Sequence, residues 1–327
     1  MEEAVILTRK AFVMGATGLQ GGAVARRLRA AGWDVVTVSR DPNTAAARSI
    51  ASTGVEVRQA CWTDLTTLQA AMAGCESLYL NLMPDLERPA AEFEQGRDIL
   101  GVAREVGVRH VVYSSAMALQ IDRTDHIVSI AFQPKADLEQ LVQTFGFSRW
   151  TILRPGFFMS NFVTPRVQIL YPAAAESGLF RLAWKPTDRL PMVDHEDIGK
   201  YGAAALGDPD RFHEKILDII SDVVKVNDAM ETMRRLTRRM VHAKYLLLKP
   251  ATEHESSEAV EGVEGAAMPE TLPDVLQKVA ARLGDPLKDY DAASEAAKWG
   301  ITEPPTTFEQ FVGREIQDFK ATFAFAF

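Results

Sequence analysis

A short glycine-rich segment near the N-terminus constrains the fold of this chain more than any other feature. The apolar run from Ala11 to Met14 is followed by the sequence GATGLQGG at residues 15–22, and then by the helix-like stretch from Ala23 to Leu28. Strand, glycine loop and helix thus follow one another directly. Glycines spaced by three allow a tight turn, a close backbone approach and close packing of helix on strand.

The start of such a helix presents free backbone N–H groups and the positive end of the helix dipole, which together favour an anion. We therefore expect a cofactor diphosphate to bind at this loop. A plain strand-to-helix turn is the alternative, and the residues that follow the loop decide between the two. The expected contacts within the loop are Gly15, Thr17, Gly18, Leu19, Gln20 and Gly21.

The end of the second predicted strand indicates which dinucleotide would bind. This strand runs from Asp34 to Ser39 and is followed at once by Arg40. In sites selective for NAD, an acidic residue at this place accepts hydrogen bonds from the ribose 2′-hydroxyl. A guanidinium instead pairs well with a 2′-phosphate, and Ser39 carries no charge that would repel the phosphate. We therefore expect NADP, the alternative being that Arg40 is a solvated loop residue.

Strand-like and helix-like segments alternate through the first 155 residues. Extended segments are predicted at 55–60, 77–82, 108–114 and 150–153, and helices at 65–73, 90–106 and around 135–145. This alternation predicts an α/β fold, a doubly wound parallel sheet of the Rossmann type, over residues 1–155. Ligands on such sheets bind beyond the carboxyl ends of the strands. The candidate contacts there are Arg40, Trp62, Thr63, Asn81, Leu82, Ser114, Ser115, Pro155, Phe157 and Phe158.

The pattern changes after residue 155, where prolines at 165, 172, 186 and 191 interrupt the chain. We expect residues 156–327 to form a smaller, mainly helical α/β domain that binds substrate and is interleaved with the sheet. Asp194 is placed to cap a helix. Residues 252–268 predict an acidic loop, residues 304–307 a break before a helix at 308–319, and residues 323–327 an apolar end that packs on the protein.

Composition excludes several classes of protein. The chain has 327 residues, of which 47% are hydrophobic, and a net charge of −8, which argues against direct binding of nucleic acid. No apolar run approaches the roughly 20 residues that span a bilayer, and the first residues lack the basic start of a signal peptide. We expect a cytosolic protein, with the nucleus left open, in which Cys61 and Cys75 are reduced structural thiols.

We expect no metal site. His195 stands among the carboxylates of Asp194, Glu196 and Asp197, but adjacent residues at a helix start point in different directions. Helix capping and exposure to solvent are therefore the preferred interpretation of this segment.

Four segments carry a resemblance to a known family. They are GATGLQG at 15–21, SRDP at 39–42, RPGFFMSN at 154–161 and VDHEDIG at 193–199. Up to about residue 240 the chain resembles the NmrA-like group of atypical short-chain dehydrogenases. The resemblance implies a Rossmann domain, a small C-terminal domain that closes over a cleft, and NAD(P) between them. Members of the group include reductases and redox sensors that bind the cofactor without chemistry.

One departure from that group concerns the catalytic residues. Short-chain dehydrogenases that reduce carbonyls place a tyrosine four residues before a lysine. Lys135 fits the lysine, but the residue four before it is Ala131. The segment from Phe132 to Lys135 is also similar to isoflavone-reductase-like enzymes, in which the lysine itself is the acid or base. The resemblance thus implies that Lys135 is catalytic and contacts the nicotinamide ribose. An exposed lysine at a helix start is the alternative, and His126, expected in a loop before that helix, is a second candidate.

Two functions follow from these residues. The first is an NADPH-dependent reductase of a small apolar or aromatic carbonyl or conjugated substrate. The second is an NADP(H) sensor without catalysis that acts through a regulatory protein partner, with the missing tyrosine as its main support. The oligomeric state is left open in both. The apolar cleft for the substrate is expected to be lined by Met83, Phe157, Phe158, Met159 and Phe162.

Overall fold

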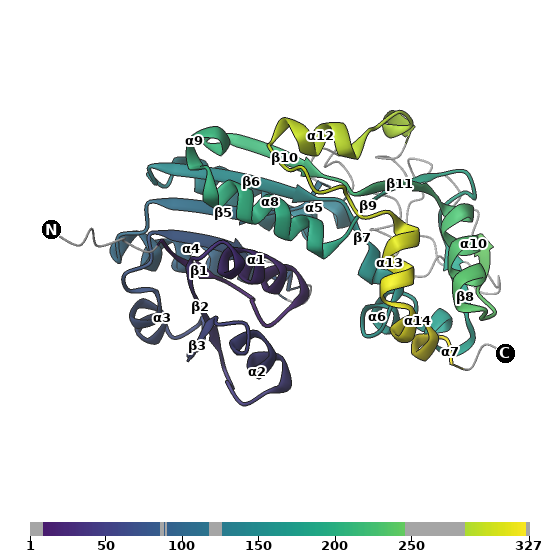
Figure 1. Cartoon of the computed structure of the whole chain (residues 1–327), viewed down its shortest axis with the longest axis horizontal. Coiled ribbons are helices and arrows are strands. Elements are labelled where there is room, and N and C mark those ends of the chain that lie inside the picture. The colour runs from purple at the N-terminus through teal and green to yellow at the C-terminus, as the bar shows by residue number, and fades with distance from the viewer. Residues whose placement is uncertain (1–8, 86–87, 89, 118–125, 246–284, 325–327) are drawn as a thin grey trace, which may run out of the picture.

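The computed structural model describes residues 9–85, 88, 90–117, 126–245 and 285–324, and only the backbone of residues 126–131 and 285. Within these residues the centre of the molecule is a sheet of seven strands in the order β10-β6-β5-β4-β1-β2-β3 (Figure 1). All neighbouring strands in this sheet are parallel. The predicted doubly wound Rossmann sheet is confirmed. Its strands are β1 (Lys10–Val13), β2 (Asp34–Ser39), β3 (Glu56–Gln59), β4 (Ser77–Asn81), β5 (His110–Ser114), β6 (Arg149–Pro155) and β10 (Lys215–Ile219).

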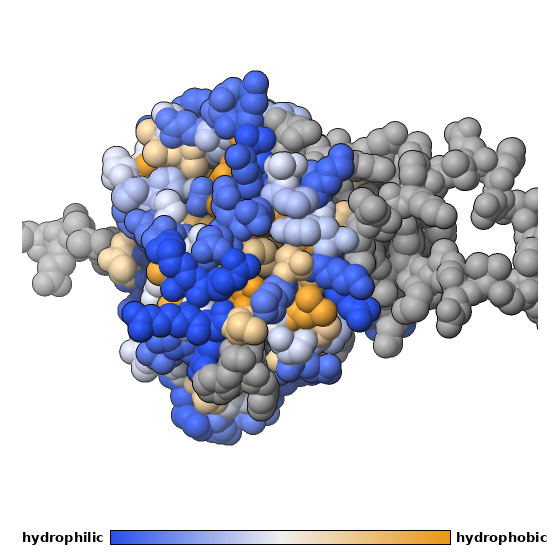
Figure 2. All heavy atoms as spheres, turned by 90° about the vertical axis from the view of Figure 1, so that its right-hand side faces the viewer, coloured by the Kyte–Doolittle hydropathy of each residue, from blue (hydrophilic) through white to orange (hydrophobic). Residues whose placement is uncertain are grey.

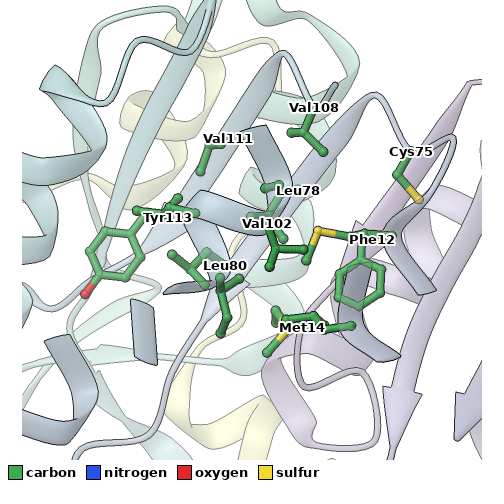
Figure 3. Packing of buried hydrophobic residues seen from close by; sticks show 14 of the residues in the cluster. Phe12, Met14, Cys75, Leu78, Leu80, Val102, Val108, Val111 and Tyr113 are labelled. Atoms are coloured by element: carbon green, nitrogen blue, oxygen red, sulfur yellow. The ribbon is translucent and has the colours of Figure 1, made fainter. Parts of the chain in front are cut away.

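Helices cover both faces of the sheet because its strands are apolar on both sides. Along β1, Ala11 and Val13 face one hydrophobic cluster, while Phe12 and Met14 face the other. Figure 3 shows this second cluster, in which side chains of β1, β4 and β5 meet those of the covering helix α4. One face of the sheet is covered by α1 (Leu19–Ala30), α8 (His195–Gly207), α9 (Pro209–Phe212) and α12 (Ala292–Lys298). The other face is covered by α3 (Leu65–Met72), α4 (Ala90–Glu105) and α5 (His126–Thr144). Helix α2 (Ala45–Ala51) connects β2 to β3.

Helix α8 lies directly against α1, and two glycines permit this contact. A Cβ atom on Gly199 would lie 2.8 Å from the Cβ of Ala23, and one on Gly202 would lie 2.7 Å from a methyl of Val24. Any larger residue at either position would force the two helices apart. The segment VDHEDIG therefore owes part of its pattern to packing against the helix that follows the glycine loop.

The second unit is built around a core of aromatic side chains. Phe162 is central to it, with ring neighbours Phe157, Tyr171, Phe180 and Phe308 at centroid distances of 5.6 to 6.1 Å. Figure 2 shows the end of the molecule formed by this unit, where hydrophilic residues surround small apolar patches. Its elements are β7 (Phe157–Phe158), η2 (Met159–Phe162), α6 (Arg166–Leu170), α7 (Pro172–Ser177), β8 (Leu179–Leu182), β9 (Arg189–Val193), β11 (Asp222–Lys225), α10 (Val226–Thr237), β12 (His242–Tyr245), η3 (Asp285–Leu287), α13 (Phe308–Arg314) and α14 (Ile316–Thr322).

The chain passes between the two units more than once. It leaves the main sheet at the end of β6, forms β7 to β9, and returns through α8 and β10 (Figure 1). The C-terminal segment also touches both units, because Trp299, just beyond α12, packs on Phe212 of α9, and Phe311 of α13 packs in the aromatic core. Residues after 155 thus contribute three helices, α8, α9 and α12, and the edge strand β10 to the unit built on the main sheet.

Two details of the predicted elements are wrong. Helix α5 begins at His126 and contains Pro134, so Lys135 lies in the middle of a helix and His126 does not lie in a loop. The helix expected at 308–319 is two helices separated at Glu315. Phe323 packs in the aromatic core as expected, while residues 252–268 lie outside the described residues. Both cysteines are free.

Among the described residues, none of the helices combines the length and apolar character that crossing a bilayer demands.

Candidate functional site

The glycine loop has the geometry that its spacing predicts. Gly15 adopts a left-handed backbone conformation with φ of +67°, and its carbonyl accepts a hydrogen bond from the N–H of Gly18 at 2.9 Å. A Cβ atom on Gly21 would lie 2.5 Å from the carbonyl oxygens of both Met14 and Gly15. The first glycine therefore makes the turn, and the third lets α1 start directly against the end of β1.

The N-terminus of α1 is open to an anion. Gly18 is the N-cap residue, no side chain caps the helix, and the first turn contains no acidic residue. Among the described residues, a Cβ atom on Gly18 would approach only the Gly15 carbonyl oxygen, at 3.4 Å. Leu19 in the first turn is exposed. Uncapped N–H groups and the helix dipole together make this end of α1 suited to a phosphate.

Gln20 connects the glycine loop to the ends of two strands. Its side-chain oxygen accepts hydrogen bonds from the hydroxyls of Tyr79 and Ser114, and its Nε2 donates to Oδ1 of Asn81 at 3.2 Å. The Nδ2 of Asn81 is left facing Gly15, 3.4 Å from where a Cβ of that residue would be. The amide of Gln20 is thus used within the protein. A contact from Gln20 to a cofactor would come from its backbone.

Arg40 lies at the corner where β2 ends, and its side chain is exposed. Its guanidinium carbon stands 5.9 Å from the centroid of the Trp62 ring, a cation–π distance that brings together two residues predicted from separate strands. The neighbouring carboxylate of Asp41 is turned to the backbone N–H of Asn43. Within the part of the chain that the structure describes, Arg40 forms no ion pair, so its charge is free to meet a ligand.

Thr63, the second residue predicted near the adenine, lies next to Trp62 and is exposed. Its hydroxyl oxygen lies 3.0 Å from the sulfur of Cys61. This hydrogen bond, together with the positive charge of Arg40, lowers the pKa of the Cys61 thiol below its usual value. The predicted contacts Arg40, Trp62 and Thr63 therefore form one group at the ends of β2 and β3, in which Arg40 and Thr63 are exposed and Trp62 is half-buried.

Lys135 is buried, contrary to the alternative of an exposed lysine at a helix start. Its Nζ lies 2.5 Å from Oε1 of Glu92, and the two side chains are 9% and 1% exposed. Glu92 belongs to the first turn of α4, and Lys135 projects from the middle of α5. The ion pair therefore joins the two helices that cover one face of the sheet.

A second buried ion pair lies in the same layer. Arg154 of β6 binds Glu139 of α5 through two hydrogen bonds. The hydroxyl of Tyr113, near the end of β5, is fully buried, and burial together with the charges of Glu92 and Glu139 raises its pKa far above the usual value. Tyr113 thus belongs to the hydrophobic core on this face of the sheet. It also shows that both carboxylates lie near the carboxyl end of β5.

The expected aromatic cleft is largely wrong. Met159 and Phe162 are fully buried and Phe157 is 8% exposed, because all three belong to the aromatic core of the second unit. Phe158 remains half-buried at the end of β7, and Met83, just beyond β4, is 61% exposed. Alternation along this short strand sends Phe157 and Phe158 to opposite sides. Only Phe158 and Met83 of this set are open to a ligand, while Leu82 and Pro155 are buried at the ends of β4 and β6.

The acidic segment at the start of α8 connects this helix to the C-terminal helix α13. Asp194 caps α8 as predicted, and it is fully buried, with two hydrogen bonds from Arg314 of α13. His195 and Asp197 are buried as well, so the expected exposure to solvent is wrong. Burial opposes ionisation of Asp194, but Arg314 and His195 outweigh it and lower its pKa. No group of residues in the described ranges could hold a metal ion.

Glu92 is the residue that sequence analysis missed. It occupies the apolar face of α4, in register with Gly96, Ile99, Leu100 and Ala103 at helical spacing. A carboxylate on such a face needs a buried cationic partner, and this is the signal that could have identified it. The partner could not have been read from spacing, since Lys135 lies 43 positions further along the chain.

Comparison with known proteins places this geometry in a family. The NmrA-like family model matches residues 8–261. The chain is similar to the NmrA-like family domain-containing oxidoreductase malD of Malbranchea aurantiaca, with 29% identity over 74% of this chain and 76% of that protein.

Two solved structures have a similar fold. The NADPH-dependent quinone oxidoreductase QOR2 from Escherichia coli, complexed with NADPH, has a TM-score of 0.66 and 21% identity over 93% of this chain and 99% of that one. NmrA, a negative transcriptional regulator in complex with NADP, has a TM-score of 0.61 and 16% identity over 90% and 99%. Because the family model covers most of the sequence, the chain belongs to the NmrA-like family.

Proposed function

We propose that this chain is an NADPH-dependent reductase of a small apolar or aromatic carbonyl or conjugated substrate. The observation that carries the proposal is the uncapped N-terminus of α1 behind the glycine loop, with the exposed Arg40, which pairs with no described carboxylate, at the neighbouring corner. These two features suit a diphosphate and a 2′-phosphate respectively. The oxidoreductase name of the relative malD and the bound NADPH of QOR2 support the same cofactor and class of reaction.

Each part of NADPH has residues suited to hold it. Gly15, Thr17, Gly18, Leu19 and Gly21 would contact the diphosphate through the loop backbone. Arg40 would bind the 2′-phosphate, with Trp62 and Thr63 beside the adenine. Asn81 and Leu82, at the end of β4, and Pro155 and Phe158, beyond β6, would border the nicotinamide half. The ring of Phe157 is held in the aromatic core, so a contact from Phe157 to the cofactor would come from its backbone.

Lys135 is our candidate for the proton donor. When bound, the cofactor supplies a hydride, and the product oxygen or carbon then needs a proton. Lys135 forms an ion pair with Glu92, whose charge acts on Tyr113 near the carboxyl end of β5, and the position of Ala131 offers no phenol. An ammonium has three N–H donors, of which Glu92 engages one. The other two suit a ribose hydroxyl and the substrate. Met83 and Phe158 favour an apolar or aromatic substrate beside this group.

A scan of NADPH oxidation at 340 nm tests this proposal, with a panel of quinones, enones and aldehydes. We expect turnover with at least one class of substrate, and faster turnover with NADPH than with NADH. The matched control is the Gly18→Val variant, in which a branched side chain would project at the N-terminus of α1, where the diphosphate is proposed to bind, and whose Cβ atom would meet only the Gly15 carbonyl, at 3.4 Å. Absence of oxidation above that control across the whole panel would reject the reductase.

A non-catalytic NADP(H) sensor is the second candidate, and Ala131 is the observation in its favour. The place four residues before Lys135 holds no phenol, and the structural neighbour NmrA is a regulator that binds NADP. If the protein is a sensor, NADPH binds tightly but none of the panel substrates is reduced. The bound cofactor then changes the affinity of this protein for a protein partner. We place either activity in the cytosol, with a small molecule rather than nucleic acid as ligand, given the net charge of −8.

A further inference from the structure

Glu92 is a buried carboxylate to which the proposed chemistry has so far given no part. We propose that it is a positioning residue, which holds the Lys135 ammonium in the place from which that group acts. This inference rests on the proposed function, because it concerns the residue chosen there as proton donor. It extends that function to a residue on a different helix.

The position of the pair favours this role. Helices α4 and α5 are in close contact one turn further along α4, where a Cβ atom on Gly96 would lie 2.4 Å from a methyl of Leu138. The backbones that carry Glu92 and Lys135 are therefore fixed relative to each other. With side chains 1% and 9% exposed and a contact of 2.5 Å, the ammonium has little freedom to move. A lysine is otherwise flexible, with four rotatable bonds, so a fixed position requires such a partner.

Among the described carboxylates between the sheet and helices α4 and α5, Glu92 is the one that pairs with Lys135. The other buried carboxylate, Glu139, uses both oxygens to bind Arg154. A buried ion pair adds little net stability, because the loss of hydration offsets most of the attraction between the charges. Packing of α4 on α5 is already provided by Gly96 and Leu138. The pair is therefore better explained by the need for a fixed charge near the end of β5 than by the need to hold the helices together.

The first experiment needs no substrate. The intact protein is treated with acetic anhydride, with and without NADPH, and acetylation of Lys135 is followed by peptide mass spectrometry, relative to the 66% exposed Lys288. In the wild type, with NADPH at about ten times its Kd, we expect acetylation of Lys135 to slow about tenfold, because only molecules without bound cofactor leave the amine uncovered. In Glu92→Gln, we expect faster acetylation and loss of most of the protection by NADPH. Glu139→Gln, the same change in the neighbouring pair, should retain it.

The second experiment is a double-mutant cycle on whichever substrate the panel identifies. Glu92→Gln should lower kcat by about tenfold with little change in KM, because the proton donor is misplaced while the pocket is kept. Glu92→Asp should recover part of kcat. In a Lys135→Met background, Glu92→Gln should have no further effect on kcat. Thermal melting of each variant checks the fold, and the double variant removes both charges, so that neither is left buried alone.

The outcomes separate this inference from the proposed function. Equal acetylation of Lys135 with and without NADPH would overturn the positioning role even if the protein is an active reductase. Additive losses of kcat in the cycle would overturn it too, since Glu92 would then act independently of Lys135. If no substrate is reduced but NADPH protects Lys135 and Glu92→Gln abolishes the protection, the positioning role stands and the reductase fails.

Discussion

At the scale of single residues, the buried charges decide what each substitution means. Lys135→Met removes the proposed proton donor, but it also leaves the carboxylate of Glu92 buried without a partner. We expect this variant to lose about 3–5 kcal/mol of unfolding free energy, the usual cost of breaking one side of a buried pair. The double variant Lys135→Met/Glu92→Gln should regain most of that loss. Urea unfolding measures both, and equal stability of the two variants would contradict the ion pair.

His110 predicts a pH dependence that is independent of the candidate site. Its ring is 5% exposed, and burial, followed by the nearby charges of His213 and Arg149, lowers its pKa from 6.5 to about 4. The unfolded chain therefore binds a proton below pH 6.5 that the folded chain does not accept until about pH 4. The contribution of neutral His110 to the free energy of unfolding is therefore complete above pH 6.5. It falls as the pH drops from 6.5 to 4, by about 3 kcal/mol for a pKa shift of this size.

The variant His110→Phe provides the check. It cannot titrate, so its unfolding free energy should decline less between pH 7 and pH 4 than that of the wild type. Parallel curves for the two proteins in urea unfolding across this range would show that His110 is not held neutral in the fold.

At the scale of elements, two glycines of the loop before α1 have different roles, Gly21 in packing of the helix and Gly18 in the proposed binding of the cofactor. Gly21→Ala places a Cβ atom 2.5 Å from two carbonyl oxygens, so we expect α1 to shift and stability to fall by at least about 1 kcal/mol. In Gly18→Val the added Cβ atom would lie 3.4 Å from the Gly15 carbonyl, an ordinary contact, so we expect nearly wild-type stability and a loss of NADPH affinity. Melting temperature and calorimetric titration measure the two effects. Equal NADPH affinity of Gly18→Val and the wild type would show that the glycine loop is a strand-to-helix turn that does not bind the cofactor diphosphate.

Sequence patterns predicted the elements of the sheet well, because strands buried on both faces carry continuous apolar runs that stop at the loops. They failed at α5, where the helix continues through Pro134 and begins nine residues before Lys135. They also failed for Phe157, Met159 and Phe162. An apolar side chain after a strand fits a ligand pocket and a second core equally well. These side chains are covered by residues far apart in the sequence, from Tyr171, Phe180 and Trp184 to Phe308 of α13, which no local pattern brings together.

At the scale of the whole molecule, the C-terminal segment, residues 285–324, contacts both units. One of its contacts is an ion pair between α13 and the start of α8. Arg314 of α13 binds both oxygens of Asp194, the cap of α8. The pKa of Asp194 is lowered in the fold, so the pair stabilises the protein above pH 3.8, and this contribution is lost as the pH falls. Arg314→Ala removes the compensation for burial of Asp194. We therefore expect acid unfolding of this variant at a higher pH than wild type, followed by circular dichroism.

A matched control is Arg97→Ala, which removes an exposed arginine paired with Asp98 on α4. Such surface pairs contribute little, so its acid unfolding should follow that of the wild type. If Arg314→Ala behaved as this control does, the joint between the units would not depend on the buried cap of α8.

The central claim is that this member of the NmrA-like family binds NADP(H), and that Arg40 selects it over NAD(H). Calorimetric titration of the wild type, Arg40→Ala and the control Arg97→Ala with NADPH and with NADH tests it most directly. We expect the wild type and the control to prefer NADPH. Loss of one charge-assisted phosphate contact, worth about 1.5–3 kcal/mol, should reduce that preference at least about tenfold in Arg40→Ala. Equal affinity of the wild type for both cofactors, or no binding of either, would contradict the account.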